Sequence, residues 1–230
     1  HQIEEPVPSL FTFALNEPAL TQLMGAVIPH VRLAIPATKL CSVGILLVTH
    51  WGVSGPATLK LSSYAARFLH EHHYHCPISI NWTGETNQQK VAEDLLHQQH
   101  LHPQKQMSTT KVFELPTRVW YYLLQRSTLN PDTRWCDLSK KALRKLVEVL
   151  TNDGYLVAGK GTFKEEFVTC GGVSLQSIHA NTLESKVIPG LYFAGEILDV
   201  DGITGGFNLQ AAWTTGYIAG KSVASTFGRE

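Results

Sequence analysis

The sequence predicts an α+β protein, and three observations support this prediction. Short apolar runs that end at Pro or Gly dominate the first part of the chain, as in β-strands. Apolar residues then recur at helical spacing through roughly residues 86 to 153. Near the C-terminus, a short apolar run leads through a glycine-rich loop into a long helix of small and apolar residues. The chain has 230 residues, of which 43% are hydrophobic and 17% charged, as in ordinary globular proteins.

The first part of the chain is expected to contain four strands and one helix. The strands are expected at residues 10–15, 31–35, 44–49 and 77–82. A turn cluster at residues 51–56 precedes a helix over residues 57–69, where apolar residues recur with a helical period. Pro56 fits the first turn of this helix, because its missing N–H group would have no intrahelical partner there.

Three helices are expected in the middle of the chain. They begin at Asn87, cover residues 116–125 and cover residues 138–151, the last with Ser139 as its N-cap. After Gly154 the pattern changes back to short strands. These are expected at residues 155–158, 167–169 and 190–196, with an interruption at residues 170–173, and a final helix follows over residues 207–227.

Composition excludes several classes of protein. The chain has 19 basic and 19 acidic residues, so its formal net charge is zero, and we expect no nucleic-acid partner. No apolar run approaches the roughly 20 residues of a membrane helix, so we expect no membrane partner. The four cysteines are widely spaced without a C-x-x-C pair, which argues against a disulfide framework and favours a reducing, cytoplasmic location.

The N-terminal residues HQIEEPVPSL have no signal-peptide architecture. We expect them to enter the middle of a longer chain, although a processed protein could begin in the same way. No G-x-G-x-x-G motif follows a strand anywhere in the sequence. By its own residues, the chain is therefore not expected to build the pyrophosphate site of a dinucleotide cofactor.

The strongest local signal for a binding site is the sequence Ala-Gly-Glu at 194–196, followed by the loop Gly-Ile-Thr-Gly-Gly-Phe-Asn at 202–208 and a helix. Backbone N–H groups and the helix dipole at such a helix start favour phosphate or the electron-rich edge of a reduced flavin. Glu196 could accept hydrogen bonds from sugar or ribitol hydroxyls. The alternatives are a tight turn into a packed helix and a solvated acid.

His50 is the one candidate catalytic residue, because it precedes the Gly-Val-Ser-Gly-Pro turn and could face a substrate cavity. The alternative is a structural histidine that is hydrogen-bonded within the turn. The turn is not a G-x-S-x-G nucleophile elbow, which excludes a serine hydrolase. No structural metal is expected, since a second ligand pair at zinc spacing is missing from the cluster His70, His72, His73, His75 and Cys76.

Several motifs together resemble one protein family. Residues 44–56, GILLVTHWGVSGP, are similar to that family's segment LLFTHxGxSGP. The C-terminal blocks FVTCGGVSL from 167, TLESK from 182, PGLYFAGEILD from 189 and GITGGFN from 202 match in order and spacing. The family is that of the BaiN/RdsA (YhiN-like) NAD(P)/FAD-dependent oxidoreductases, which include aminoacetone-oxidase-like flavoproteins. The similarity covers nearly the whole chain, with the weakest part in the helical middle.

The resemblance implies an architecture and a cofactor. A two-dinucleotide-binding FAD domain would be interrupted by an insert that combines a β-barrel-like subdomain with a helical subdomain. Residues 1–158 would be this insert, with helices at about 86–153, and residues 159–230 the C-terminal segment of the FAD domain. An N-terminal FAD-binding half, absent here, would be the partner needed to hold FAD.

The resemblance also implies cofactor-contacting residues and an activity. Gly195 and Glu196 would form the ribitol-contacting turn, and the helix start under the flavin ring would comprise Thr204, Gly205, Gly206, Phe207, Asn208 and Leu209. Cys170 departs from the small or basic residue usual before the double glycine. The parent protein would transfer a hydride between a small-molecule substrate and flavin, while this part alone would be inactive. The alternative is a non-catalytic interaction module that reuses the insert.

Overall fold

The computed structural model describes residues 1–161 and 168–227, and the chain divides into two compact units. Unit 1 comprises His1–Phe11, Ser62–Glu71 and Phe163–Glu230, and unit 2 comprises Thr12–Leu61 and His72–Thr162. Each unit therefore draws on segments that are far apart in the sequence.

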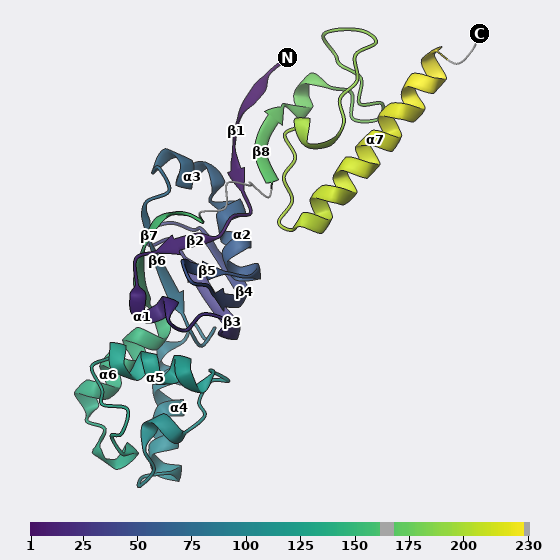
Figure 1. The fold of residues 1–230 in the computed structure, drawn as a ribbon. Helices are drawn as coiled ribbons and strands as arrows, with labels where there is room; N and C mark the ends of the chain where they lie inside the picture. The colour runs from purple at the N-terminus through teal and green to yellow at the C-terminus, as the bar shows by residue number, and fades with distance from the viewer. Residues whose placement is uncertain (162–167, 228–230) are drawn as a thin grey trace. The chain divides into compact units, whose positions relative to one another are not determined.

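Unit 2 is built on a closed six-stranded antiparallel barrel (Figure 1). Its strands are β2 (Phe13–Leu15), β3 (Val27–Ala34), β4 (Cys41–Val48), β5 (Gly52–Ser54), β6 (Cys76–Asn81) and β7 (Asp153–Lys160). They follow the order β2-β5-β4-β3-β6-β7, and β7 pairs with β2 to close the barrel. Alternate side chains of β3 and β6 fill the interior, as shown by the fully buried Val31, Leu33, Ile78 and Ile80.

Two glycines of the motif at residues 44–56 allow close backbone contacts around this barrel. A Cβ atom on Gly52 would overlap the carbonyl oxygen of Phe13 on the paired strand β2. Gly55 has φ +90°, and a Cβ there would lie 2.9 Å from the carbonyl oxygen of Ile45. The motif glycines therefore serve the closure of the barrel and the turn that follows β5.

The helical part of unit 2 consists of α4 (Gln88–Leu101), α5 (Thr117–Arg126) and α6 (Lys140–Thr151), with the short helices α1 (Pro18–Thr21), η1 (Met107–Thr109) and η2 (Trp135–Asp137). The side chain of Asn87 caps α4, and Ser139 Oγ accepts from the backbone N–H of Ala142 to cap α6. The indole N–H groups of the buried Trp120 and Trp135 donate to Met107 O and Thr110 Oγ1, respectively.

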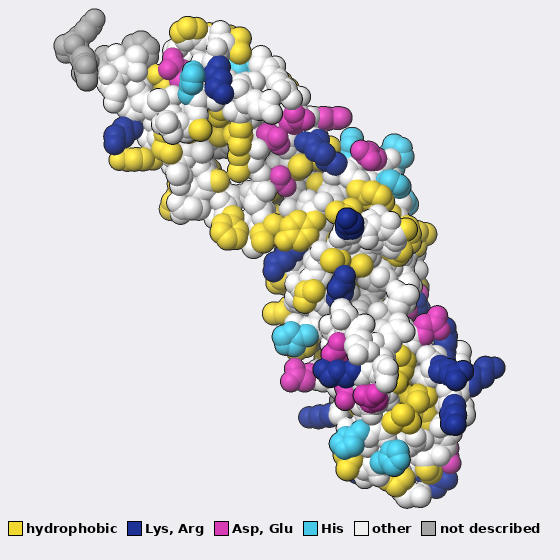
Figure 2. Space-filling view, turned by 180° about the vertical axis from the view of Figure 1, so that it is seen from behind, with side chains coloured by type: hydrophobic (Ala, Val, Ile, Leu, Met, Phe, Trp, Pro, Cys, Tyr) yellow, Lys and Arg dark blue, Asp and Glu magenta, His cyan; other side chains and the backbone are white. Residues whose placement is uncertain are grey.

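Charge is unevenly distributed along the chain. Residues 86–152 contain ten Lys and Arg against six Asp and Glu, so this region carries a net charge of +4. The remaining residues contain nine basic and thirteen acidic side chains and carry −4. In Figure 2, dark blue Lys and Arg side chains gather over the helical part of unit 2.

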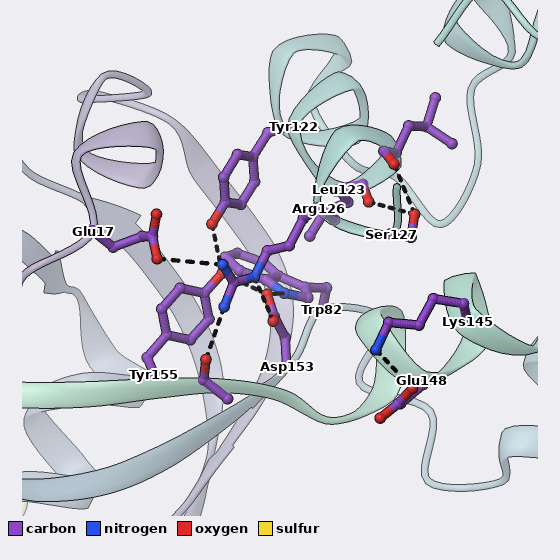
Figure 3. Close-up of polar contacts among 12 residues, drawn as sticks. Glu17, Trp82, Tyr122, Leu123, Arg126, Ser127, Lys145, Glu148, Asp153 and Tyr155 are labelled. Carbon is purple, nitrogen blue, oxygen red and sulfur yellow. Dashed lines mark hydrogen bonds and ion pairs between the residues drawn. The ribbon is translucent and has the colours of Figure 1, made fainter. Parts of the chain in front are cut away.

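A polar network joins the helices of unit 2 to its barrel (Figure 3). The carboxylate of Asp153, on β7, is buried and accepts from Arg126 Nε of α5 at 2.6 Å. Its other oxygen accepts from the Trp82 indole at 3.1 Å and from the hydroxyl of Tyr155. Arg126 also pairs with Glu17 at 3.3 Å and donates to Gly154 O at 2.8 Å, so its guanidinium links α5 both to β7 and to the segment before α1.

Two tyrosines, Tyr122 and Tyr155, extend this network, and the donor of each of their hydrogen bonds can be assigned. Burial raises the pKa of Tyr122 to about 12, and burial together with the charge of Asp153 raises the pKa of Tyr155 well above its ordinary value. Both hydroxyls therefore keep their protons at neutral pH. Because Tyr155 donates its single proton to Asp153, the 3.0 Å hydrogen bond between the two hydroxyls must have Tyr122 as its donor.

Unit 1 pairs β1 (Ile3–Ser9) with β8 (Val168–Val173) in an antiparallel ribbon. Its helices are α3 (Ala66–Glu71), η3 (Leu175–Ser177), η4 (Gly195–Ile197) and the long α7 (Gly205–Phe227), and α2 (Pro56–Tyr64) spans the boundary between the units. A small core gathers the buried side chains Val173, Ile178, Leu183, Leu198 and Ala219.

The structure confirms the predicted α+β class and the barrel, and it corrects three local expectations. The helix expected at residues 57–69 breaks at Ala65 into α2 and α3. Residues 170–173 do not interrupt a strand, because they belong to β8; Phe167, expected to begin it, lies outside the described residues. Residues 190–196 are not a strand; they contain one isolated bridge, between Tyr192 and Glu184, and the start of η4. Glu196 therefore does not end a sheet strand.

Candidate functional site

A pocket of about 320 Å³ opens at the N-terminal end of α7 in unit 1. Its lining includes five of the eight residues expected to contact a cofactor: Gly195, Glu196, Gly205, Asn208 and Leu209. The other lining residues are Val168, Leu198, Val200, Ala211, Ala212 and Thr215. Thr204, Gly206 and Phe207 belong to the same loop and helix start but do not line the pocket.

Gly195 and Glu196 form one wall of this pocket through the short helix η4. Gly195 has φ +77° and donates its N–H to Thr215 Oγ1 of α7 at 2.9 Å, which fixes the turn against the helix. Glu196 is exposed, and one of its carboxylate oxygens accepts from the backbone N–H of Thr169 at 2.7 Å. Among the described residues, the second oxygen has no partner, so it is available to a ligand hydroxyl.

The loop before α7 is held in shape by Asn208. Its side-chain oxygen accepts from Gly202 N at 2.7 Å, while its amide group donates to Gly202 O at 3.0 Å and Thr204 O at 2.8 Å. The N–H groups of Gly205 and Gly206 have no partner among the described residues. Two free donors thus lie at the positive end of a 23-residue helix, beside the pocket.

These features fit part of a flavin cofactor. Apolar side chains of α7 such as Leu209 and Ala212 offer a surface for a planar ring, and the helix start favours negative charge at one edge of that ring. The unpaired oxygen of Glu196 fits a sugar-like hydroxyl. A pocket of about 320 Å³ is at the small end of the roughly 300–1,000 Å³ usual for ligand sites, so it could hold only a part of FAD.

His50 belongs to unit 2, whereas the cofactor candidates belong to unit 1. It is in the turn between β4 and β5, and its ring packs edge-on against Trp51 with 4.2 Å between ring centroids. The indole N–H of Trp51 donates to Thr12 Oγ1 at 3.2 Å. His50 itself is exposed, and its catalytic role stays a prediction.

Cys170 lies on β8 next to a carboxylate that sequence reasoning did not connect with it. Burial and the nearby Asp201 raise the pKa of its thiol to about 11. Ser9 Oγ donates to Asp201 Oδ2 at 2.9 Å, so the carboxylate joins β1 to the loop before α7. The thiol keeps its proton at neutral pH, which makes it a poor nucleophile.

Two further properties concern metals and membranes. Across residues 1–161 and 168–227, no three His, Cys, Asp or Glu side chains are grouped so that they could hold a metal ion. Within the same residues, none of the helices combines the length and apolar character needed to cross a bilayer.

Unit 2 is a domain of the class that combines a closed antiparallel barrel with a group of helices. Comparison with known proteins identifies its family. Residues 7–168 match the family described as "HI0933-like protein barrel and H2TH domain". The chain therefore belongs to the HI0933-like family, which confirms the resemblance found in the sequence.

Three relatives illustrate this similarity. The chain is 31% identical to the ribosomal RNA dihydrouridine synthase of Escherichia coli (strain K12), over 93% of this chain and 51% of that protein. It is 30% identical to the protein of the same name from Haemophilus influenzae, over 93% and 50%. Identity with the 3-dehydro-bile acid delta(4,6)-reductase of Clostridium scindens is 29%, over 79% and 44%. The chain thus spans about half the length of these relatives.

Proposed function

We propose that this chain supplies the flavin-contacting C-terminal segment and the barrel-and-helix insert of an FAD-dependent oxidoreductase. The observation that carries the proposal is the pocket at the start of α7, which gathers five of the residues expected from sequence to contact the cofactor. A bound flavin would supply hydride-transfer chemistry, and the protein would position and electrostatically tune its ring. Gly205, Gly206 and the dipole of α7 would stabilise negative charge on the reduced ring.

The names of the relatives support reduction of a carbon–carbon double bond as the reaction. Dihydrouridine is uridine with its ring double bond reduced, and a delta(4,6)-reductase acts on double bonds of a steroid. When a flavin reduces such a bond, a hydride adds to one carbon of the double bond and a proton to the other. A nicotinamide cofactor is a suitable source of the electrons that reduce the flavin.

The exposed side chains of α7 support a requirement for a second, cofactor-binding half. Phe207, Leu209, Trp213 and Tyr217 are 62%, 64%, 75% and 71% exposed, which is unusual for large apolar groups so close together. A nucleotide-binding half that supplies the pyrophosphate site would cover them and enclose the ring. This part of the chain alone would then bind FAD weakly and be inactive.

The rival function is a non-catalytic interaction module, and blocking the pocket distinguishes the two. Leu209→Trp would fill the pocket from an exposed position, so we expect FAD affinity of the whole protein to fall at least tenfold, about 1.4 kcal/mol. FAD release followed by flavin fluorescence measures this. Leu209→Met is the matched control, because methionine has a similar volume and would leave the pocket open. Equal FAD affinity in both variants would refute the site.

Glu196→Ala provides a second test of the pocket. A charge-assisted hydrogen bond to a ribitol hydroxyl contributes on the order of 1.5–3 kcal/mol, so its loss should weaken FAD binding about tenfold or more. Thermal melts of the apo protein serve as the control, since the exposed carboxylate accepts one hydrogen bond from Thr169. Normal FAD retention, or an apo form that no longer folds, would rule out a cofactor role for Glu196.

A further inference from the structure

The net charge of zero conceals a strongly basic surface on one helix of unit 2. Within the helical region, which carries +4, four cations lie in the first six residues of α6: Lys140, Lys141, Arg144 and Lys145. All four are exposed. Lys145 pairs with Glu148 at 2.9 Å. No ion pair forms between the other three and any described acidic residue, and we call these three residues the α6 basic face.

Helix geometry places the three side chains together. Arg144 follows Lys140 by four residues and Lys141 by three, so all three project from one side of α6. The buried residues Leu146, Val149 and Leu150 lie on the side of α6 that faces away from these cations, and they pack towards the rest of unit 2. The α6 basic face is therefore displayed to solvent from a helix whose position is fixed by its apolar side.

The position of these cations is unfavourable for the isolated helix. Lys140 and Lys141 occupy the first turn, where the helix dipole is positive, and this turn contains no acidic residue. Like charges three and four residues apart also repel one another. An anion with several closely spaced charges would relieve both effects at once.

The composition of the surface favours a phosphate backbone over a protein partner. Among the described residues of α6, no large apolar side chain is exposed. Protein interfaces concentrate aromatic and apolar residues at their centre and are depleted of lysine there. Nucleic-acid interfaces, by contrast, are polar and strongly positive, and Lys and Arg supply most contacts to phosphate oxygens.

We propose that the α6 basic face binds the phosphate backbone of an RNA substrate and so sets the orientation of that RNA on unit 2. This inference rests on the proposed function. It replaces two expectations from the sequence: the small-molecule substrate implied by the family resemblance, and the absence of a nucleic-acid partner expected from the net charge of zero. The two relatives that match over 93% of this chain carry ribosomal RNA in their names. Phosphate contacts of this kind set orientation and register without reading the base sequence.

The test uses the whole protein with FAD bound and purified ribosomal RNA as the probe. In the triple variant Lys140→Gln, Lys141→Gln and Arg144→Gln, we expect the affinity for RNA to fall at least tenfold at physiological salt. The slope of log affinity against log salt concentration should become less negative by about 2–3. Each lost phosphate contact removes roughly 0.7–0.9 from the magnitude of this slope. Glutamine preserves helix propensity, so the fold should persist.

A second triple variant removes the same total charge elsewhere: Lys39→Gln, Lys60→Gln and Lys221→Gln. It should bind RNA nearly as the wild type does, because these three lysines belong to elements and loops other than α6 and are not part of the α6 basic face. Equal losses in both triples, or tighter binding to anionic lipid vesicles than to RNA, would overturn the proposal. The flavin absorbance of each variant separates this outcome from failure of the proposed function, since the α6 basic face is not part of the pocket at α7.

Discussion

Asp153→Ala is expected to lower the free energy of unfolding of unit 2 by about 3–5 kcal/mol. The carboxylate is only 4% exposed, and it accepts hydrogen bonds from Arg126, Trp82 and Tyr155. Its removal would leave a partly buried guanidinium, an indole N–H and a phenol without their shared acceptor. Breaking one side of a buried ion pair costs more than the pair itself contributes, because the remaining charge stays desolvated.

Chemical unfolding followed by tryptophan fluorescence measures this loss, since Trp82 belongs to the network. Glu148→Ala is the matched control: it also removes a carboxylate from an Arg or Lys partner, but its pair with Lys145 is exposed on both sides. Its effect should be far smaller. A third variant, Tyr122→Phe, removes only the outermost donor of the network and should fall between the two. Similar losses for Asp153→Ala and Glu148→Ala would contradict the role of burial.

Gly52→Ala is expected to prevent normal closure of the barrel. A Cβ atom at this position would overlap Phe13 O and lie 2.7 Å from Leu15 N, and both atoms belong to the backbone of β2. Backbone of a paired strand cannot move aside as a flexible side chain can. We therefore expect a loss of about 3 kcal/mol or more, from overpacking together with the unfavourable φ of +155°.

Gly159→Ala separates the steric effect from the conformational one. Gly159 and Gly52 both pair with Ala14, one from β7 and the other from β5. The backbone angle φ of Gly159 is also positive, at +149°, but among the described residues other than its two chain neighbours no atom lies within 4 Å of a Cβ built there. Thermal melts of the two variants should therefore show a clearly larger loss for Gly52→Ala. If the two losses are equal, steric closure is not the reason for glycine in this motif.

Local sequence signals predicted the helices of unit 2 well, because their determinants are local. Ser139 was recognisable as an N-cap, and its side chain accepts a backbone N–H group in the structure. Asn87, expected only to begin its helix, caps that helix in the same way. The apolar period of residues 138–151 marked the buried side of α6. The barrel, in contrast, was expected only from the family resemblance, since strand patterns do not reveal which strands pair.

The strand β1 could not be predicted, because its sequence IEEPVPS contains two prolines and two glutamates. Proline is tolerated there because a two-stranded ribbon leaves each strand with an open edge. The partner strand β8 was also difficult to predict, because Gly171 and Gly172 are unusual in the middle of a strand. A Cβ on these residues would overlap the carbonyl oxygens of Glu5 and Ile197, so the glycines permit a close approach that only the folded structure reveals.

The candidate site was suggested by the glycine loop, but its construction was not predictable. Asn208 was expected to contact the cofactor, and the structure also shows it holding the loop at Gly202 and Thr204.

The α6 basic face was missed because only the total charge of the chain was considered. That total is zero, since the positive charge of residues 86–152 is cancelled by the negative charge of the rest of the chain.

The pairing of β1 with β8 has a consequence for the order of folding. Val7 pairs with Cys170, so the ribbon joins residues separated by almost the whole of unit 2. Closing such a long disordered loop is entropically costly and slow. The barrel removes most of this cost, because Gly161 donates its N–H to Thr12 O at 3.0 Å and so brings the two ends of the segment together. During synthesis β1 must therefore wait, unpaired, until the barrel has closed, and damage to the barrel would leave that strand exposed to aggregation.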